Sequence, residues 1–232
     1  MCFSATASFS AGVVLLGLGT LTLRSARFSA QRRALPFAAI PLLFAIQQLI
    51  EGVIWLTFRT DTPLLNSAMS HAYSFFSHVL WPAYVPLAVW LIEPPVWRRH
   101  VLLVFVAGGF AVATYLLYML VAFPVVSRPT GQHIEYVSAH FFAVVTMTLY
   151  LLSTTTSPLF STHRWVQVFG ALALLAFGAA YYFYAQWFIS VWCFFAALLS
   201  VVIYLHFALH GRANFMSAAA ETRPATSRSR LL

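Results

Sequence analysis

Seven long apolar stretches, separated by short polar segments, constrain this chain more than any other feature of its sequence. A helix needs about 20 apolar residues to cross the roughly 30 Å of hydrocarbon in a bilayer. The chain is 61% hydrophobic and 8% charged, whereas about a quarter of the residues in a soluble domain are charged. The sequence therefore predicts an all-α polytopic membrane protein with seven transmembrane helices. They are expected at residues 5–23, 35–58, 71–93, 101–123, 135–154, 165–185 and 188–210.

The arginines predict how these helices are oriented. Cytoplasmic loops of membrane proteins carry an excess of basic residues. If the N-terminus lies outside, only Arg59 and Arg128 fall on the outer side, and eleven arginines fall on the cytoplasmic side. The N-terminus is therefore predicted outside and the C-terminus in the cytoplasm. The net charge of +8 is explained by this orientation and does not indicate a nucleic-acid partner. The eleven are Arg24, Arg27, Arg32, Arg33, Arg98, Arg99, Arg164, Arg212, Arg223, Arg228 and Arg230.

One transmembrane domain is expected over residues 1–211, and a polar, Arg-rich cytoplasmic tail without stable structure over residues 212–232. All 13 basic residues are arginine. The missing lysine excludes chemistry that needs a lysine amine, such as a retinal or pyridoxal Schiff base. No positively charged segment precedes the first apolar stretch, and no convincing cleavage site follows it. The first helix is therefore expected to be retained.

A carboxylate interrupts the second apolar stretch, "LPFAAIPLLFAIQQLIEGVIWL", at Glu51. An ionisable group at the centre of a span costs about 2.5–3.5 kcal/mol on insertion scales, so it is expected to face the bundle and a partner. Glu51, His78 and His140 each lie about seven residues, or roughly 10.5 Å of helix, inside the outer end of a predicted span. For the two histidines this distance is counted from His71 and His133. The three side chains are therefore predicted to share one level near the outer face.

Two imidazoles and a carboxylate match a catalytic zinc site with an open fourth position, and they also suit other first-row transition metals. Gln48 and Ser74 are expected to orient the ligands or position a substrate. His71 and His133 form a second pair nearer the surface and are weaker candidates for ligands. The alternative is that the glutamate and a histidine neutralise each other with no metal.

Cys2 lies near the same predicted outer mouth, and three interpretations stay open: a metal ligand, a disulfide partner of Cys193, or an unpaired side chain. His206 and His210 are four residues apart on the last predicted helix, a spacing that can hold one metal ion. They fall near the cytoplasmic end and are therefore not expected at the level of His78.

The segments "MCFSATASFSAG", "PLLFAIQQLIEG", "SHVLWPAYVPLAVWLIEP" and "FISVWCFFAALLS" resemble an uncharacterised family of bacterial seven-helix membrane proteins. That resemblance covers the chain except its tail, and implies a multi-pass protein of the bacterial inner membrane. A weaker resemblance is to the alkaline ceramidase and adiponectin-receptor superfamily of membrane zinc hydrolases. Ser74 with His78, and His206 with His210, match two of its short motifs, but its water-activating aspartate has no counterpart after His78.

Two functions of different classes follow from these features. The first is a zinc-dependent hydrolase that acts within the membrane on a lipid or a small molecule. The second is a non-catalytic protein that handles metal ions or protons, senses a signal, or belongs to a larger membrane complex. A haem held by two histidines is a further alternative, although the chain has no attachment motif. The expected partners are the bilayer, the substrate, and a second copy of the chain or a membrane complex.

Overall fold

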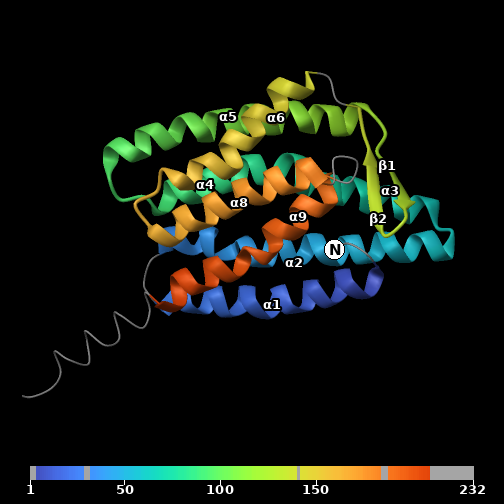
Figure 1. Cartoon of the computed structure of the whole chain (residues 1–232), viewed down its shortest axis with the longest axis horizontal. Coiled ribbons are helices and arrows are strands. Elements are labelled where there is room, and N and C mark those ends of the chain that lie inside the picture. Colours follow the sequence, from blue (N-terminus) through green and yellow to red (C-terminus); the bar gives the residue numbers. More distant parts are fainter. Residues whose placement is uncertain (1–3, 29–31, 140–141, 184–187, 210–232) are drawn as a thin grey trace, which may run out of the picture.

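The computed structural model describes residues 4–28, 32–139, 142–183 and 188–209, and it shows an elongated helix bundle with a β-hairpin at one end (Figure 1). In chain order the elements are α1 (Ala5–Phe28), the 3-10 helix η1 (Arg32–Ala34), α2 (Leu35–Thr60), α3 (Pro63–Ser74), the π-helix η2 (Phe75–Leu80), α4 (Trp81–Ile92), α5 (Val96–Ala122), β1 (Val126–Thr130), β2 (His133–Val137), α6 (Ala143–Leu151), the π-helix η3 (Leu152–Thr156), α7 (Ser157–Leu159), α8 (Arg164–Phe183) and α9 (Phe188–Leu198). A further helix, Ser200–Leu209, follows α9.

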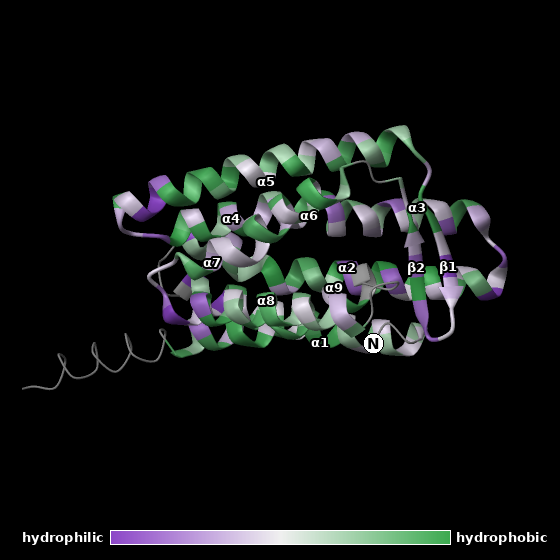
Figure 2. Ribbon diagram, turned by 45° about the horizontal axis from the view of Figure 1, so that its top comes forward, coloured by the Kyte–Doolittle hydropathy of each residue, from purple (hydrophilic) through white to green (hydrophobic). Residues whose placement is uncertain are grey.

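Five helices of the described ranges are long and apolar enough to cross a membrane. They correspond to the first four and the sixth of the seven predicted spans, and they indicate a membrane protein. Figure 2 shows hydrophobic residues along most of their length and hydrophilic residues concentrated toward their ends. The five are Ala5–Arg27, Arg32–Thr60, Pro63–Ile92, Val96–Ala122 and Arg164–Phe183.

The other two predicted spans are built from shorter pieces. The last one consists of α9 and the helix Ser200–Leu209, which are separated at Leu199. The fifth, predicted over residues 135–154, is strand at its beginning and becomes helical only at Ala143. The prediction of a helix that begins near His133 was therefore wrong, and the all-α description needs a two-stranded antiparallel sheet added to it.

The hairpin forms because alternating side chains can be buried on one face of the strands. Ile134 and Tyr136 are buried while their neighbours are more exposed. Two residues join the strands, and the first, Gly131, has φ +62°, as a two-residue hairpin turn requires. The segment is apolar enough to resemble the start of a membrane helix, but its buried side chains alternate along the chain, as they do in a strand. His133 consequently lies on a strand and not on a helical face.

The α2 helix lies at the centre of the core, with α1 packed along it and α4, α8 and α9 on its other sides (Figure 1). A side chain at Gly12 or Gly19 would overlap Leu49 or Leu42 of α2, so these two glycines let the α1 and α2 backbones approach closely. The main hydrophobic core includes Phe37 and joins all of these helices.

The span Pro63–Ile92 changes its winding at its centre. Pro82 has no N–H to donate to the carbonyl of His78 four residues earlier, so the regular α-helical bonding is interrupted there. The preceding turn, η2, is a π-helix, in which the Trp81 N–H donates to the Phe76 carbonyl five residues back. Such π-bulges occur frequently at functional sites.

Candidate functional site

Five polar side chains lie on α2, α3 and η2 near the end of the bundle where the hairpin packs, and we call them the α2–α3 polar cluster. Four are almost completely buried: Gln47, Gln48 and Glu51 of α2 and Ser74 of α3 are at most 1% exposed. The fifth, His78 in η2, is half-buried. Buried polar groups are costly unless they are paired, so a concentration of this kind in apolar helices indicates a site rather than a packing core.

A hydrogen bond fixes how the two helices of this cluster face each other. The indole N–H of Trp81 donates to Oε1 of Gln47 over 2.8 Å. Toward the hairpin, Glu51 is four residues beyond Gln47, and His78 is three residues beyond Trp81 on the antiparallel helix. The first step is about 6 Å of α-helix rise. The second falls within the π-helix η2, where residues three apart do not share one face. Glu51 and His78 therefore lie at a similar level along the two helices.

The His78 imidazole is held by the serine next to it in sequence. Nδ1 of His78 and Oγ of Ser77 lie 2.8 Å apart, and the same Oγ lies 3.3 Å from the Ser74 carbonyl. Metal-binding histidines are commonly oriented in this way, by a hydrogen bond at one ring nitrogen.

An aromatic cluster closes the site on the hairpin side. The Tyr73 ring stacks on Tyr136 of β2 with their centroids 4.5 Å apart, and Ile54 and Ile134 complete this second core. A chain of hydrogen bonds between polar side chains also holds β1 against the helices. It joins Ser70 to Ser127, Ser127 to Asn66, and Asn66 to Thr57, each over 2.8–2.9 Å. These contacts hold the hairpin against α3 and the end of α2, beside the cluster.

Several buried polar atoms of this region have no hydrogen-bond partner among the residues that the structure describes. They include both amide atoms of Gln48, Nε2 of Gln47, Oγ of Ser74 and Nε1 of Trp55. A buried polar atom left unsatisfied costs about 1–3 kcal/mol. So many in one place are explained by a bound polar species, by water, or by side chains outside the described ranges.

Four of the residues that the sequence predicted lie on α2, α3 and η2, near the end of the bundle where the hairpin packs: Gln48, Glu51, Ser74 and His78. Their assignment to one metal site stays a prediction. His140, Cys2 and His210 lie outside the described residues. Phe142, two residues after His140, has φ +53°, a left-handed conformation that a bulky side chain seldom adopts. In the described part of the chain, no group of three His, Cys, Asp or Glu side chains could hold a metal ion, so a complete site needs a further ligand.

The two outer histidines lie on different elements. His71 is on α3, and its Nδ1 donates to the Ser67 carbonyl over 2.8 Å within the same helix. His133 is the first residue of β2, where partial burial lowers the pKa of its imidazole and favours the neutral form. His133 therefore lies on a strand and not at the start of a fifth helix, where the sequence predicted it to pair with His71.

A second polar cluster lies at the opposite end of the bundle. Glu93, at the end of α4, is 3% exposed and accepts hydrogen bonds from Oγ of Ser161 and from the backbone N–H of Thr162, both at 2.9 Å. Nε2 of His163 donates to the Ile92 carbonyl over 3.2 Å, and its ring lies 5.4 Å from that of His206. Sequence reasoning placed Glu93 at the end of the third predicted span, 71–93, and did not include it among the candidate site residues. A carboxylate at the end of an apolar stretch, followed by two prolines, was the signal that it missed.

Aromatic and aliphatic side chains separate the two polar clusters. The Phe44 ring stacks on Trp81 with centroids 3.9 Å apart, and Phe37 packs edge-on against Phe169. From Trp81 to Glu93 is twelve residues, or roughly 18 Å of helix. His206 belongs to the Glu93 end, where it packs against Phe37. It therefore lies far from His78, as the sequence predicted from the lengths of the spans.

Comparison with known proteins places the chain in a family but gives it no activity. The model of a family described as a family of unknown function, DUF6629, matches residues 1–219. No curated protein matches the chain, and no solved structure does. None of these findings supports the resemblance to the alkaline ceramidase and adiponectin-receptor superfamily. A match of this extent shows that the chain belongs to the DUF6629 family of proteins of unknown function.

Proposed function

We propose that this protein is a membrane-embedded metalloprotein whose α2–α3 polar cluster holds a zinc ion, or another first-row transition metal, and hydrolyses a lipid or a small molecule. The observation that carries the proposal is the level shared by Glu51 and His78 inside apolar helices. A carboxylate and an imidazole on facing helices supply two ligands of types that zinc prefers. His140 is the proposed third ligand, and Cys2 is a further candidate.

The chemistry of the described residues fits a metal. The His78 imidazole, which Ser77 orients through Nδ1, is a ligand type that first-row transition metals accept. The unsatisfied amide of Gln48 and hydroxyl of Ser74 can donate to or accept from a polar substrate group. A bound zinc ion would lower the pKa of its water toward about 7 and so supply a nucleophile. In this proposal Gln48 and Ser74 position the substrate carbonyl, and the hairpin limits access of bulk water.

The apolar layer between the two polar clusters favours a closed site over a conduit. A proton or ion path needs polar groups or water across the bilayer. Below Gln47, by contrast, the described core offers the stacked pair Phe44 and Trp81, with Phe169 beyond them. A non-catalytic role in transport is therefore the less favoured alternative.

We further propose that the protein lies in the bacterial inner membrane with seven spans, its N-terminus outside and the hairpin on the outer side. A reporter that is active only in the cytoplasm, fused after Leu232, is expected to be active. A reporter inserted at Pro129, next to the exposed turn at Gly131, is expected to be active only if it functions outside the cytoplasm. The opposite pair of signals would reverse the orientation and place the α2–α3 polar cluster on the cytoplasmic side.

Elemental analysis tests the metal proposal directly. Protein purified without chelators is expected to contain about one equivalent of a first-row transition metal, because a structural or catalytic zinc site binds a single ion. Removal of the metal with a chelator should lower the melting temperature, since an ion that binds only the folded state stabilises it. Protein that is metal-free as purified, takes up no metal and melts normally would show that Glu51 and His78 are structural partners.

A further inference from the structure

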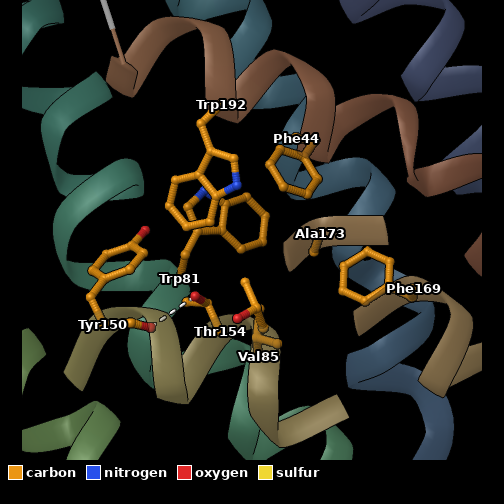
Figure 3. A pocket seen from close by; sticks show the side chains of 9 residues that line it. Phe44, Trp81, Val85, Tyr150, Thr154, Phe169, Ala173 and Trp192 are labelled. Atoms are coloured by element: carbon orange, nitrogen blue, oxygen red, sulfur yellow. Dashed lines mark hydrogen bonds between the residues drawn. The ribbon is translucent and has the colours of Figure 1, made fainter. Parts of the chain in front are cut away.

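A small apolar pocket lies between the α2–α3 polar cluster and the end of the bundle opposite the hairpin. Figure 3 shows the aromatic rings that line it, which belong to Phe44, Trp81, Tyr150, Phe169 and Trp192. Its cavity volume is about 30 Å³, whereas sites for small molecules usually have roughly 300–1,000 Å³. The pocket is therefore too small to hold a substrate, and the far end of the bundle is a separate surface.

Among the described residues, seven arginines lie at this far end, which we call the basic end. The helices α2, α5 and α8 begin there, and α1 ends there (Figure 1). Figure 2 shows hydrophilic residues gathered at the same end of these helices. Five of the seven side chains are exposed, while Arg98 and Arg99 are half-buried. The seven are Arg24, Arg27, Arg32, Arg33, Arg98, Arg99 and Arg164.

Little negative charge within the described ranges offsets these arginines. Of the carboxylates there, Glu93 alone lies at the basic end, where it is buried and accepts hydrogen bonds from Ser161 and Thr162. Its charge is therefore used to hold the loop between α7 and α8. None of the helices α2, α5 and α8 has an acidic residue in its first turn, where carboxylates usually offset the positive end of the helix dipole. The basic end consequently carries a large net positive charge.

The hairpin end of the bundle is balanced in charge by comparison. Its two described arginines, Arg59 and Arg128, each have an acidic residue nearby in the chain or the sheet. Asp61 follows Arg59 by two residues. Glu135 lies directly opposite Arg128 in the hairpin, a position from which cross-strand side chains interact. Acidic neighbours are thus provided at one end of the bundle and left out at the other, where the positive charge is available to an external anion.

Contacts within the basic end hold two of its guanidinium groups in place. Nη1 of Arg98 donates to the Phe160 carbonyl over 3.0 Å, and the Arg99 guanidinium lies 4.5 Å from the centre of the Trp90 ring. A guanidinium has five N–H donors in a planar fork that matches the oxygens of a phosphate, and each of these contacts uses only part of it. Trp97 beside them is 61% exposed, and tryptophan is enriched where a membrane meets water.

We propose that the basic end binds the phosphate headgroups of anionic phospholipids in the surrounding bilayer. The helices that begin or end there are long and apolar enough to cross a membrane, so their ends lie at the level of the headgroups. A zwitterionic headgroup carries its own cation and offers no net charge, whereas an anionic headgroup complements the arginines. This binding goes beyond the proposed function, because it involves neither a metal nor the α2–α3 polar cluster.

Native mass spectrometry of the full-length protein tests this binding in detergent micelles that contain equal amounts of phosphatidylglycerol and phosphatidylcholine with the same acyl chains. Each arginine near an anionic surface strengthens binding about fivefold, so bound phosphatidylglycerol is expected to exceed bound phosphatidylcholine by about tenfold or more. Higher ionic strength should reduce this preference, because salt screens exposed charges. Equal binding of the two lipids by the wild type would overturn the proposal. Displacement of the lipid by inorganic phosphate would overturn it too, because the surface would then bind free phosphate.

Two double variants that remove the same charge from opposite ends give a matched comparison. Arg32→Gln with Arg33→Gln is expected to lower the affinity for phosphatidylglycerol by about tenfold or more. Arg59→Gln with Arg128→Gln at the hairpin end should leave it unchanged. An equal loss in both would show that the preference follows net charge alone and would contradict the proposal. If the first pair does not fold, Arg164→Gln removes one exposed arginine at the start of α8 and should lower the affinity about fivefold.

Discussion

Gly109→Ala is expected to lower the free energy of unfolding by about 3 kcal/mol, which is at the upper end for an overpacked core. A methyl group at Gly109 would lie 2.0 Å from the carbonyl oxygen of Pro82 and 3.2 Å from the ring of Pro86. The nearest obstacle is backbone, so no side-chain rotation relieves the overlap. The helices α4 and α5 would have to separate.

The close approach has a cause in the sequence of α4. Pro86 has no N–H, so the carbonyl of Pro82 loses its helical donor four residues later. Gly109 brings its backbone against that carbonyl, where a Cα–H group can make a weak contact that partly satisfies it. Substitution therefore removes the contact and adds a collision at the same point.

The adjacent glycine is a matched control. At Gly108 the nearest atom to an added methyl group is Oγ of Ser153 at 3.9 Å, an ordinary contact distance. Gly108→Ala is expected to be neutral or to stabilise the helix by about 0.5–1 kcal/mol, since glycine is unfavourable inside a helix. Denaturant or thermal unfolding of both variants in detergent measures the difference. Equal stabilities would show that α4 and α5 do not pack as described.

Loss of metal is the second large effect expected. If zinc is held as proposed, His78→Ala and Glu51→Gln should each reduce metal affinity by about 100-fold or more, because loss of a residue that only supports a ligand already costs about 10–100-fold. Ser77→Ala should cost about tenfold, since Ser77 orients the His78 imidazole through Nδ1. Elemental analysis of the purified variants, followed by competition with a chromophoric chelator, gives the affinities.

His163→Ala provides the control for this series. His163 belongs to the Glu93 cluster at the other end of the bundle, so its removal should leave metal content unchanged. Metal content that falls equally in all variants would indicate a general loss of folding. Unchanged metal content in His78→Ala and Glu51→Gln would contradict the assignment of the site, even if the wild type contains metal.

Depth along the helices was only partly predictable. Counting residues from the predicted ends of two spans put Glu51 and His78 at one level, and the hydrogen bond between Trp81 and Gln47 is consistent with that level. The count began at His71, however, whereas α3 begins at Pro63, so the helix ends themselves do not give this level. The same count failed for the pair His133 and His140, because it assumed a helix where β2 has formed.

Hydropathy alone could not separate the hairpin from a membrane helix. The stretch from His133 to Leu152 is apolar for most of its length, and its first five residues bury alternate side chains against Tyr73 and Ile54. That burial depends on the far end of α2 and α3, some sixty residues earlier in the chain. Glu93 was missed for a similar reason, since its partners Ser161 and Thr162 lie nearly seventy residues later.

The sequence by itself determined the membrane class, five of the seven apolar helices it predicted, and the presence of a buried carboxylate, because these follow from composition and from the fixed geometry of a helix in lipid. Only the tertiary structure decided what surrounds that carboxylate. Contacts between distant segments make Gln47 face Trp81, hold the hairpin against the helices and form the apolar pocket beside Tyr150. Such contacts are selected by packing and by pairing of buried polar groups across the whole bundle, and no local pattern encodes them.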